Sequence, residues 1–234
     1  MSTVDLPESL VPAARALFSD RLPVAQRYAE LLATEGVLRG LIGPREADRI
    51  WDRHLLNCAA AGEILPDGAS VTDVGSGAGL PGIALAIARP DLSVVLLDSL
   101  ARRTTFLTEA VAELGLTDRV SVARGRAEEL AGRVPEADIV TARAVAPLDR
   151  LATWCLPLTM VGGRLVALKG GTAEEEVAVH RAVVGRLGGG TPIVRRCGVG
   201  LLAEPTTVVE VVRERVAPGG APGRRATVPG RRTR

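Results

Sequence analysis

Residues 73–82 read DVGSGAGLPG, and this stretch decides the fold of the chain. The apolar run VTDV leads into glycines at alternate positions, and Pro81 then opens the helix-length apolar segment GIALAIA. This order predicts a strand, a tight loop and the N-terminus of a helix. Glycine permits positive φ and close approach of a ligand to the backbone. Free N–H groups and the helix dipole then suit an anionic group.

A second acidic residue, Asp98, ends the next apolar run, SVVLLD. A carboxylate at the end of the second strand can accept hydrogen bonds from both hydroxyls of a ribose. The loop and Asp98 together therefore predict a site for a nucleoside-bearing cofactor.

Glycine spacing separates the candidate cofactors. A dinucleotide fingerprint needs a third glycine at position 80, but that position is Leu80 and the third glycine is Gly79. The pattern acid-x-G-x-G-x-G, with Asp73 as the acid, resembles the first motif of the Rossmann-like, S-adenosylmethionine-dependent methyltransferases. An acid suits the ammonium group at the methionine end of that cofactor. A nicotinamide dehydrogenase and a glycine-rich turn of another α/β protein are the alternatives, and the Gly-Lys-Ser/Thr of a P-loop is absent.

Bulk composition is that of a globular protein. The chain has 234 residues, of which 47% are hydrophobic and 24% charged, as expected for one domain with short extensions. The first residues do not resemble a signal peptide and no run is long enough to span a membrane. Cys58, Cys155 and Cys197 are scattered, which predicts neither disulfides nor a metal site. A cytoplasmic location is expected.

Charge is distributed unevenly along the chain. The net charge is +2, but residues 217–234 hold five arginines and no acid, so residues 1–216 carry −3 (2 − 5). The tail is predicted to be disordered, and it either adds phosphate contacts to RNA or is simply solvated. Lys169 is the only lysine among 29 basic residues. Its position at a strand end favours a role in the site.

Hydrophobic periodicity predicts an α/β architecture. Helices are expected from Pro23 to a stop at Gly36 and again from Pro44, with Ala47, Ile50, Trp51, His54, Leu55 and Cys58 on one buried face. Strands are expected at 70–74, 94–98, 119–123, 138–142 and 163–168, with a final antiparallel pair at 193–199 and 206–213. Helices are expected at 81–88, 101–114, 147–156 and 173–187. The alternation predicts a mostly parallel sheet with helices on both faces.

The carboxyl ends of these strands form one rim, where ligands of open α/β sheets bind. This rim collects residues 73–79, Asp98, the segment RGRAEEL at 124–130, Arg143 and Lys169. Ala127 and Glu128 either flank an adenine or are the ordinary acid-bearing first turn of a helix. Arg102 and Arg103, after Asp98, are candidate phosphate contacts.

Several separate segments together resemble one family. They are WDRHLLNCA at 51–59, DVGSGAGLPGI at 73–83, LLDSLARRTTFL at 96–107, TARAVAPL at 141–148 and VALKGG at 166–171. Over about residues 20–212 the chain resembles the bacterial small-subunit (16S) ribosomal RNA guanine-N7 methyltransferase G family, or glucose-inhibited division protein B. The resemblance implies a class I methyltransferase fold with a seven-stranded sheet. It divides the chain into an N-terminal helical extension (1–62), the S-adenosylmethionine-dependent domain (63–216) and the tail (217–234).

The resemblance also implies a set of site residues. Gly75 and Leu80 would line the methionine side of S-adenosylmethionine, Asp98 would hold the ribose, and Ala127 and Glu128 would flank the adenine. Arg143 would lie between cofactor and RNA. The cofactor-binding residues expected are Asp73, Gly75, Ser76, Gly77, Gly79, Leu80, Asp98, Ser99, Ala127, Glu128 and Arg143.

The residues expected on the RNA side of the pocket differ in how clearly they indicate a function. The resemblance places His54 and Lys169, with Arg143, near the pocket mouth as positioning groups. A histidine on an apolar helical face is also often an ordinary buried residue, so both interpretations of His54 stay open. His180 is expected at the surface. Glu204 stands where a basic residue would suit RNA, which argues against an RNA contact there.

The implied reaction is methylation of guanine N7 in 16S ribosomal RNA, free or in the small subunit, by a monomer. N7 has a free lone pair, so no general base or nucleophile is needed, and positioning supplies most of the catalysis. The segment TARAV lacks the Asn/Asp-Pro-Pro-aromatic motif of exocyclic-amine methylation, and Cys155 lies mid-helix instead of in a Pro-Cys loop. A small-molecule methyltransferase and a non-catalytic RNA-binding protein are the alternative functions.

Overall fold

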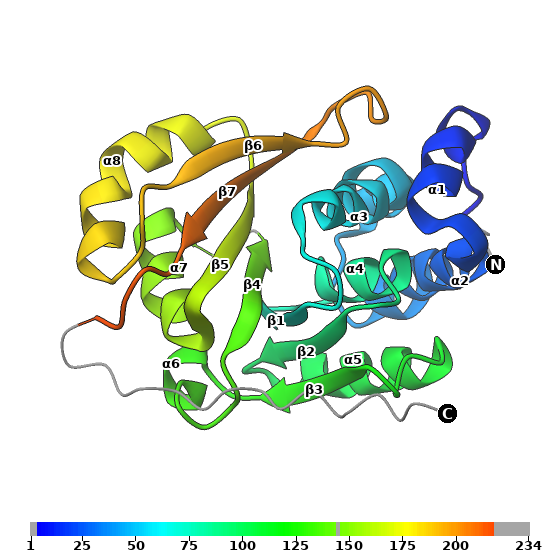
Figure 1. Cartoon of the computed structure of the whole chain (residues 1–234). Coiled ribbons are helices and arrows are strands. Elements are labelled where there is room, and N and C mark those ends of the chain that lie inside the picture. Colours follow the sequence, from blue (N-terminus) through cyan, green and yellow to red (C-terminus); the bar gives the residue numbers. More distant parts are fainter. Residues whose placement is uncertain (1–3, 144–145, 218–234) are drawn as a thin grey trace, which may run out of the picture.

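The computed structural model describes residues 4–143 and 146–217. Its strands and helices alternate along the chain from residue 70 to residue 197, as the periodicity predicts (Figure 1). The α-helices are α1 Val11–Phe18, α2 Leu22–Leu31, α3 Asn57–Ala60, α4 Gly82–Ala88, α5 Ala101–Glu113, α6 Ala127–Leu130, α7 Leu148–Cys155 and α8 Ala173–Arg186. The strands are β1 Ser70–Val74, β2 Ser93–Asp98, β3 Val120–Arg124, β4 Ala137–Arg143, β5 Thr159–Lys169, β6 Ile193–Cys197 and β7 Thr206–Val212.

The strands form one seven-stranded sheet in the order β3-β2-β1-β4-β5-β7-β6. Strands β1 to β5 pair in parallel, whereas β7 runs antiparallel to both β5 and β6. The predicted fold, a mostly parallel sheet closed by an antiparallel pair, is confirmed. Because the chain order reverses between β1 and β4, the carboxyl ends of these two strands border the crevice in which such sheets bind ligands.

Alternate residues of the strands face two separate cores. Leu96 and Val166 belong to one hydrophobic cluster, while their neighbours Leu97 and Leu165 belong to the other. The first cluster lies under α1 to α5 and the second under α6 to α8, on the opposite face of the sheet (Figure 1). Burial on both faces explains why the strands are continuous apolar runs.

The N-terminal helices share the first cluster with α4 and α5. Phe18 and Tyr28 are buried there together with residues of β1 and β2. The predicted stop at Gly36 is wrong, because helical geometry continues from α2 through a π-helical stretch, Leu32–Gly36, as far as residue 38. Gly40, at φ 64°, follows it. Gly36 instead allows close packing, since a Cβ there would lie 3.3 Å from Ile42.

The helix predicted from Pro44 forms, but its winding changes along its length. It begins as a 3-10 helix, Pro44–Arg49, becomes a π-helix, Ile50–Leu56, and ends as α3. Its predicted inner face is buried apart from Ala47, which is only partly buried. π-Helical turns occur frequently at functional sites, and His54 lies within this one.

Several boundaries differ from those predicted. Arg143 is the last residue of β4 instead of the residue after it. Strand β5 begins at Thr159, four residues early, and its register with β4 shifts between Ala137 and Ile139. Strand β6 ends at Cys197 because Gly198, at φ 75°, turns the chain. The short helices α1 and α6 are additional elements.

Two further findings concern membrane-spanning helices and the C-terminal tail. Within residues 4–143 and 146–217, no helix is both long and apolar enough to cross a membrane. The predicted disordered tail lies outside the described residues apart from Ala217.

Candidate cofactor pocket and adjoining cleft

The glycine-rich loop after β1 turns on three left-handed residues. Gly75, Gly77 and Gly79 have φ values of 72°, 58° and 95°. The N–H groups of Gly75 and Ser76 donate to the carbonyl of Leu97 at 2.8 and 3.1 Å, which ties the loop to the end of β2. A side chain at any of these three glycines would be strained, so the sequence motif and the backbone agree.

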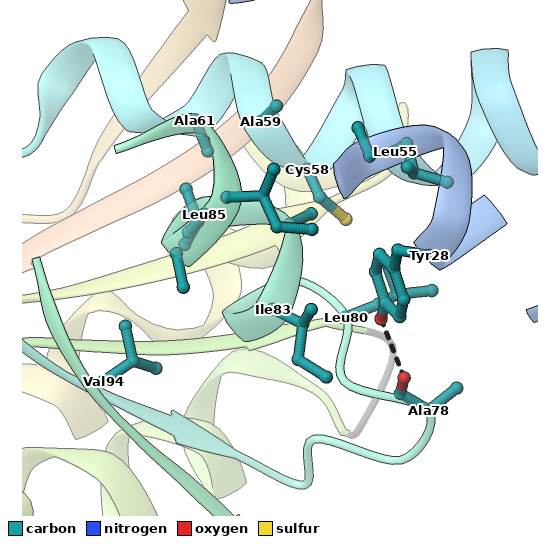
Figure 2. Packing of buried hydrophobic residues seen from close by; sticks show 14 of the residues in the cluster. Tyr28, Leu55, Cys58, Ala59, Ala61, Ala78, Leu80, Ile83, Leu85 and Val94 are labelled. Atoms are coloured by element: carbon teal, nitrogen blue, oxygen red, sulfur yellow. Dashed lines mark hydrogen bonds between the residues drawn. The ribbon is translucent and has the colours of Figure 1, made fainter. Parts of the chain in front are cut away.

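The loop is supported from below by α2. The buried hydroxyl of Tyr28 donates to the carbonyl of Ala78 at 2.8 Å (Figure 2). A Cβ on Gly79 would lie 2.9 Å from that hydroxyl and 2.4 Å from Ile83. The N-terminal helices therefore fix the loop conformation, a contact between segments 50 residues apart.

Asp73 lies fully buried under the loop. Its Oδ2 accepts from the N–H of Gly82 at 3.0 Å, at the start of α4, while Oδ1 is buried with no hydrogen-bond partner. Burial raises the pKa of this carboxyl to about 7, and the charge of Asp98 adds to the rise, against the opposing effects of Gly82 and Arg143. An unsatisfied buried carboxylate oxygen is costly and suits a cationic ligand group.

Asp98, at the end of β2, is buried and already hydrogen-bonded. It accepts from the N–H groups of Gly77 and Leu100 at 3.0 Å each, and from the guanidinium of Arg103 at 3.3 Å. Arg103, which the sequence marks as a candidate phosphate contact, thus pairs with the predicted ribose acceptor.

Two hollows flank this loop. One, of about 390 Å³, is lined by Gly75, Ser76, Gly77, Leu80 and Arg143 among others. The second, of about 290 Å³, is lined by Gly75, Asp98, Ser99, Ala127 and Glu128 among others. Both include Gly75 and Arg103. The predicted cofactor residues thus line two adjoining hollows, except that Asp73 lies beneath the loop and Gly79 faces Ile83 and Tyr28.

A larger cleft of about 1210 Å³ opens beside the first hollow. All three predicted positioning residues, His54, Arg143 and Lys169, line it. Arg143 also lines the first hollow, so it is the residue at which the predicted cofactor side and the cleft meet.

His54 holds Arg143 at this junction. Its Nδ1 lies 2.9 Å from a terminal nitrogen of Arg143, and its Nε2 lies 3.2 Å from the carboxylate of Glu46. Burial, and then the charge of Arg143, lowers the pKa of His54 to about 4. The imidazole is therefore neutral near pH 7, and Nδ1 is the acceptor for the guanidinium N–H.

Lys169, the last residue of β5, has partners within the protein. Its ammonium donates to the carbonyl of Ala146 at 2.9 Å and to the carboxylate of Glu176 at 2.7 Å. The same Glu176 oxygen accepts from the N–H of Leu148 at 3.1 Å. Lys169 and Glu176 therefore hold the chain between β4 and α7, a few residues after Arg143.

Some residues of the site were not found by sequence reasoning. Trp154 and Arg150 line the second hollow, and Leu41 and Ile42 line the first. His180, expected at the surface, is partly buried and lines the cleft. Glu204, which is exposed, lines the cleft as well. No pattern in the sequence distinguishes Trp154 from an ordinary core residue of an amphipathic helix. Among the residues described, no group of three or more candidate ligands assembles a metal site.

The strand order, the glycine-rich loop after β1 and the acid ending β2 define a Rossmann-like, class I methyltransferase. The fold alone is shared with mitomycin 7-O-methyltransferase, with a TM-score of 0.57 and 19% identity over 88% of this chain and 66% of that one. Within this class the family can be stated. Residues 21–197 match the family model described as rRNA small subunit methyltransferase G (GidB), and the chain belongs to that family.

Curated relatives agree with this assignment. The chain is 65% identical to ribosomal RNA small subunit methyltransferase G of Salinispora tropica, over 92% of this chain and 91% of the relative. It is 56% identical to the protein of the same name from Streptomyces coelicolor, over 90% of this chain and 85% of the relative. The expected family membership is confirmed.

Proposed function

We propose that this enzyme transfers a methyl group from S-adenosylmethionine to N7 of one guanine in 16S ribosomal RNA. The observation that carries the proposal is the position of Arg143, which lines both the hollow beside the glycine-rich loop and the large cleft. We further propose that residues 63–216 form the catalytic domain with residues 1–62 as its helical extension, and that the enzyme acts as a cytoplasmic monomer.

The residues present fit S-adenosylmethionine. The carboxylate of Asp73 lies just beneath the loop, where its negative charge suits the ammonium of the methionine end, and the backbone at Gly75 and Gly77 is open to a ligand. Asp98 suits the ribose hydroxyls, and Ala127 and Glu128 in the second hollow suit the adenine. Bound there, the cofactor would supply a methyl group already activated by its sulfonium sulfur.

The residues of the cleft position the base instead of reacting with it. Guanine N7 attacks through its own lone pair, so no residue must remove a proton. Neutral His54 fixes the guanidinium of Arg143, and Lys169 with Glu176 fixes the chain that follows Arg143. Holding the reacting atoms in line supplies the rate enhancement that orientation can give.

Methyl transfer to RNA tests this proposal. Labelled S-adenosylmethionine is incubated with unmodified small-subunit RNA, free and as assembled subunits, and the product is cleaved with borohydride and aniline, which cut at N7-methylguanosine. We expect one cleavage site. Transfer without cleavage would contradict N7 as the acceptor, and failure of transfer to either RNA by cofactor-bound enzyme would favour a small-molecule acceptor.

Cofactor affinity is expected to depend on pH through Asp73. The pKa of its carboxyl in the free protein is about 7, and a bound ammonium would favour the ionised form. Affinity for S-adenosylhomocysteine should therefore rise as pH increases towards 7, by up to about tenfold per pH unit below that value, and then level off. Calorimetry from pH 5.5 to 7.5 should also detect proton release.

Asp73→Asn is the control for this dependence. The amide can still accept a hydrogen bond from Gly82 but cannot ionise, so the variant should bind more weakly with an affinity independent of pH in this range. His54, with a pKa of about 4, does not titrate there. A slope that persists in the variant would assign the titration to another group.

A further inference from the structure

The aromatic residues of this chain are few, and one differs from the rest. The sequence has two Trp, two Phe and one Tyr, all within the described residues. Phe18, Tyr28, Trp51 and Phe106 are at most 2% exposed and belong to the first core. Trp154 alone is partly exposed, and it lines the hollow that contains Asp98 and Ala127.

Trp154 is paired with Arg150 on the same face of α7. The two residues are one helical turn apart, and the guanidinium carbon of Arg150 lies 5.0 Å from the centroid of the Trp154 ring. Both side chains line the hollow. Arg150 is exposed, and its contact with the indole of Trp154 orients its guanidinium beside the hollow.

The chemistry of the hollow suits a purine. It contains a carboxylate for ribose hydroxyls (Asp98), a small apolar residue (Ala127), and an exposed carboxylate (Glu128) able to accept from an exocyclic amine. Such a site lacks only a flat surface for the ring. Aromatic rings and guanidinium planes both pack well against bases.

We propose that the Arg150–Trp154 pair forms the wall against which the adenine of the cofactor packs, and that it sets the affinity of the enzyme for the nucleoside part of the cofactor. The inference rests on the proposed cofactor site but adds two residues on α7 to it. A purine leaving this wall would re-expose the pair to solvent, so binding should change the environment of the indole.

Ligand fluorescence and affinity test the wall. The probes are S-adenosylhomocysteine and methylthioadenosine, which share adenosine but differ in the amino-acid part. Both should change the tryptophan emission of the unmodified protein. The change should vanish in Trp154→Phe and persist in Trp51→Phe, because Trp51 is buried away from the hollow.

Substitutions separate the purine half of the site from the methionine half. Trp154→Ala should weaken both nucleosides by the same factor, about ten- to a hundredfold, as expected for loss of base stacking. Arg150→Ala should weaken both by up to about tenfold. Trp154→Phe should restore most of the affinity. In turnover, KM for S-adenosylmethionine should rise while kcat stays within about twofold, since the wall does not touch the reacting atoms.

The matched control is Arg133→Ala, an exposed arginine that lines neither hollow. It should leave both affinities unchanged. If Arg150→Ala and Trp154→Ala bound both nucleosides with unchanged affinity, the proposed adenine wall would be wrong. A loss of RNA methylation without a loss of nucleoside affinity would also contradict it, and would instead assign the pair to RNA binding. If neither nucleoside bound the unmodified protein, the proposed cofactor site would fall as well.

Discussion

Gly75→Asp is expected to abolish cofactor binding while leaving the protein folded. Gly75 has φ 72° and lines both hollows. A carboxylate there would fill space next to the loop and add negative charge near Asp73 and Asp98. Affinity for S-adenosylhomocysteine, measured by calorimetry, should fall on the order of a hundredfold or more, corresponding to at least about 2.7 kcal/mol.

Backbone strain requires a matched control. Gly115 also has a left-handed φ, 65°, and has nothing within 4 Å of the position of a Cβ. Gly115→Asp therefore carries the same backbone cost, about 1–2 kcal/mol, without reaching the loop. Both variants should lose similar thermal stability, but only Gly75→Asp should lose cofactor binding. Unchanged affinity in Gly75→Asp would show that the cofactor lies elsewhere.

Lys169→Ala should impair RNA methylation without impairing cofactor binding. Its ammonium joins Ala146 to Glu176 beside the cleft but lines neither of the two hollows. We expect kcat/KM for RNA to fall about ten- to a hundredfold, or 1.4–2.7 kcal/mol, with affinity for S-adenosylhomocysteine changed less than about twofold. Full turnover would mean that the lone lysine has no positioning role.

Glu176 separates two ways in which Lys169 could act. If Lys169 positions the chain after Arg143, Glu176→Ala should reduce kcat in the same direction, and the double variant should be little worse than Lys169→Ala alone. If Lys169 instead contacts RNA directly, Glu176→Ala would leave a free ammonium and retain activity. We expect the first result, because both side chains hold the same segment.

Much of the fold could be predicted because its strands are short, buried apolar runs. Burial of β1, β2, β4 and β5 on both faces makes them visible in sequence, and parallel order follows from the alternation with helices. The π-helical turn at Ile50–Leu56 could not be predicted, since apolar spacing marks which face is buried and not which carbonyl each N–H selects. The predicted helix end at Gly36 was wrong because the sequence does not show why a glycine is present. Here its small size allows close packing against Ile42 and does not end the helix.

The geometry of the candidate site was predictable where a motif fixes the backbone, and less so where contacts join distant segments. The glycines and Asp98 follow from local geometry and pattern. Three contacts of the candidate site join residues more than twenty positions apart in the sequence. They are the hydrogen bond from Tyr28 to the loop, the contact between His54 and Arg143, and the hydrogen bond from Lys169 to the carbonyl of Ala146. The pairing of Arg103 with Asp98 and the position of Trp154 beside the second hollow could be seen only in the three-dimensional structure. An arginine or a tryptophan on a helix can have many different neighbours, and its place in the sequence does not say which.

The first hydrophobic core has a consequence for the synthesis of the chain. It contains both Ala13, in the first α-helix to be synthesised, and Val208, in β7, the last strand to be synthesised. During translation the apolar faces of α1 to α3 emerge before any strand exists to cover them. They stay incompletely covered until nearly the whole chain has left the ribosome. At synthesis rates of about 5–20 residues per second, this apolar surface stays open to transient partners for roughly ten seconds or more.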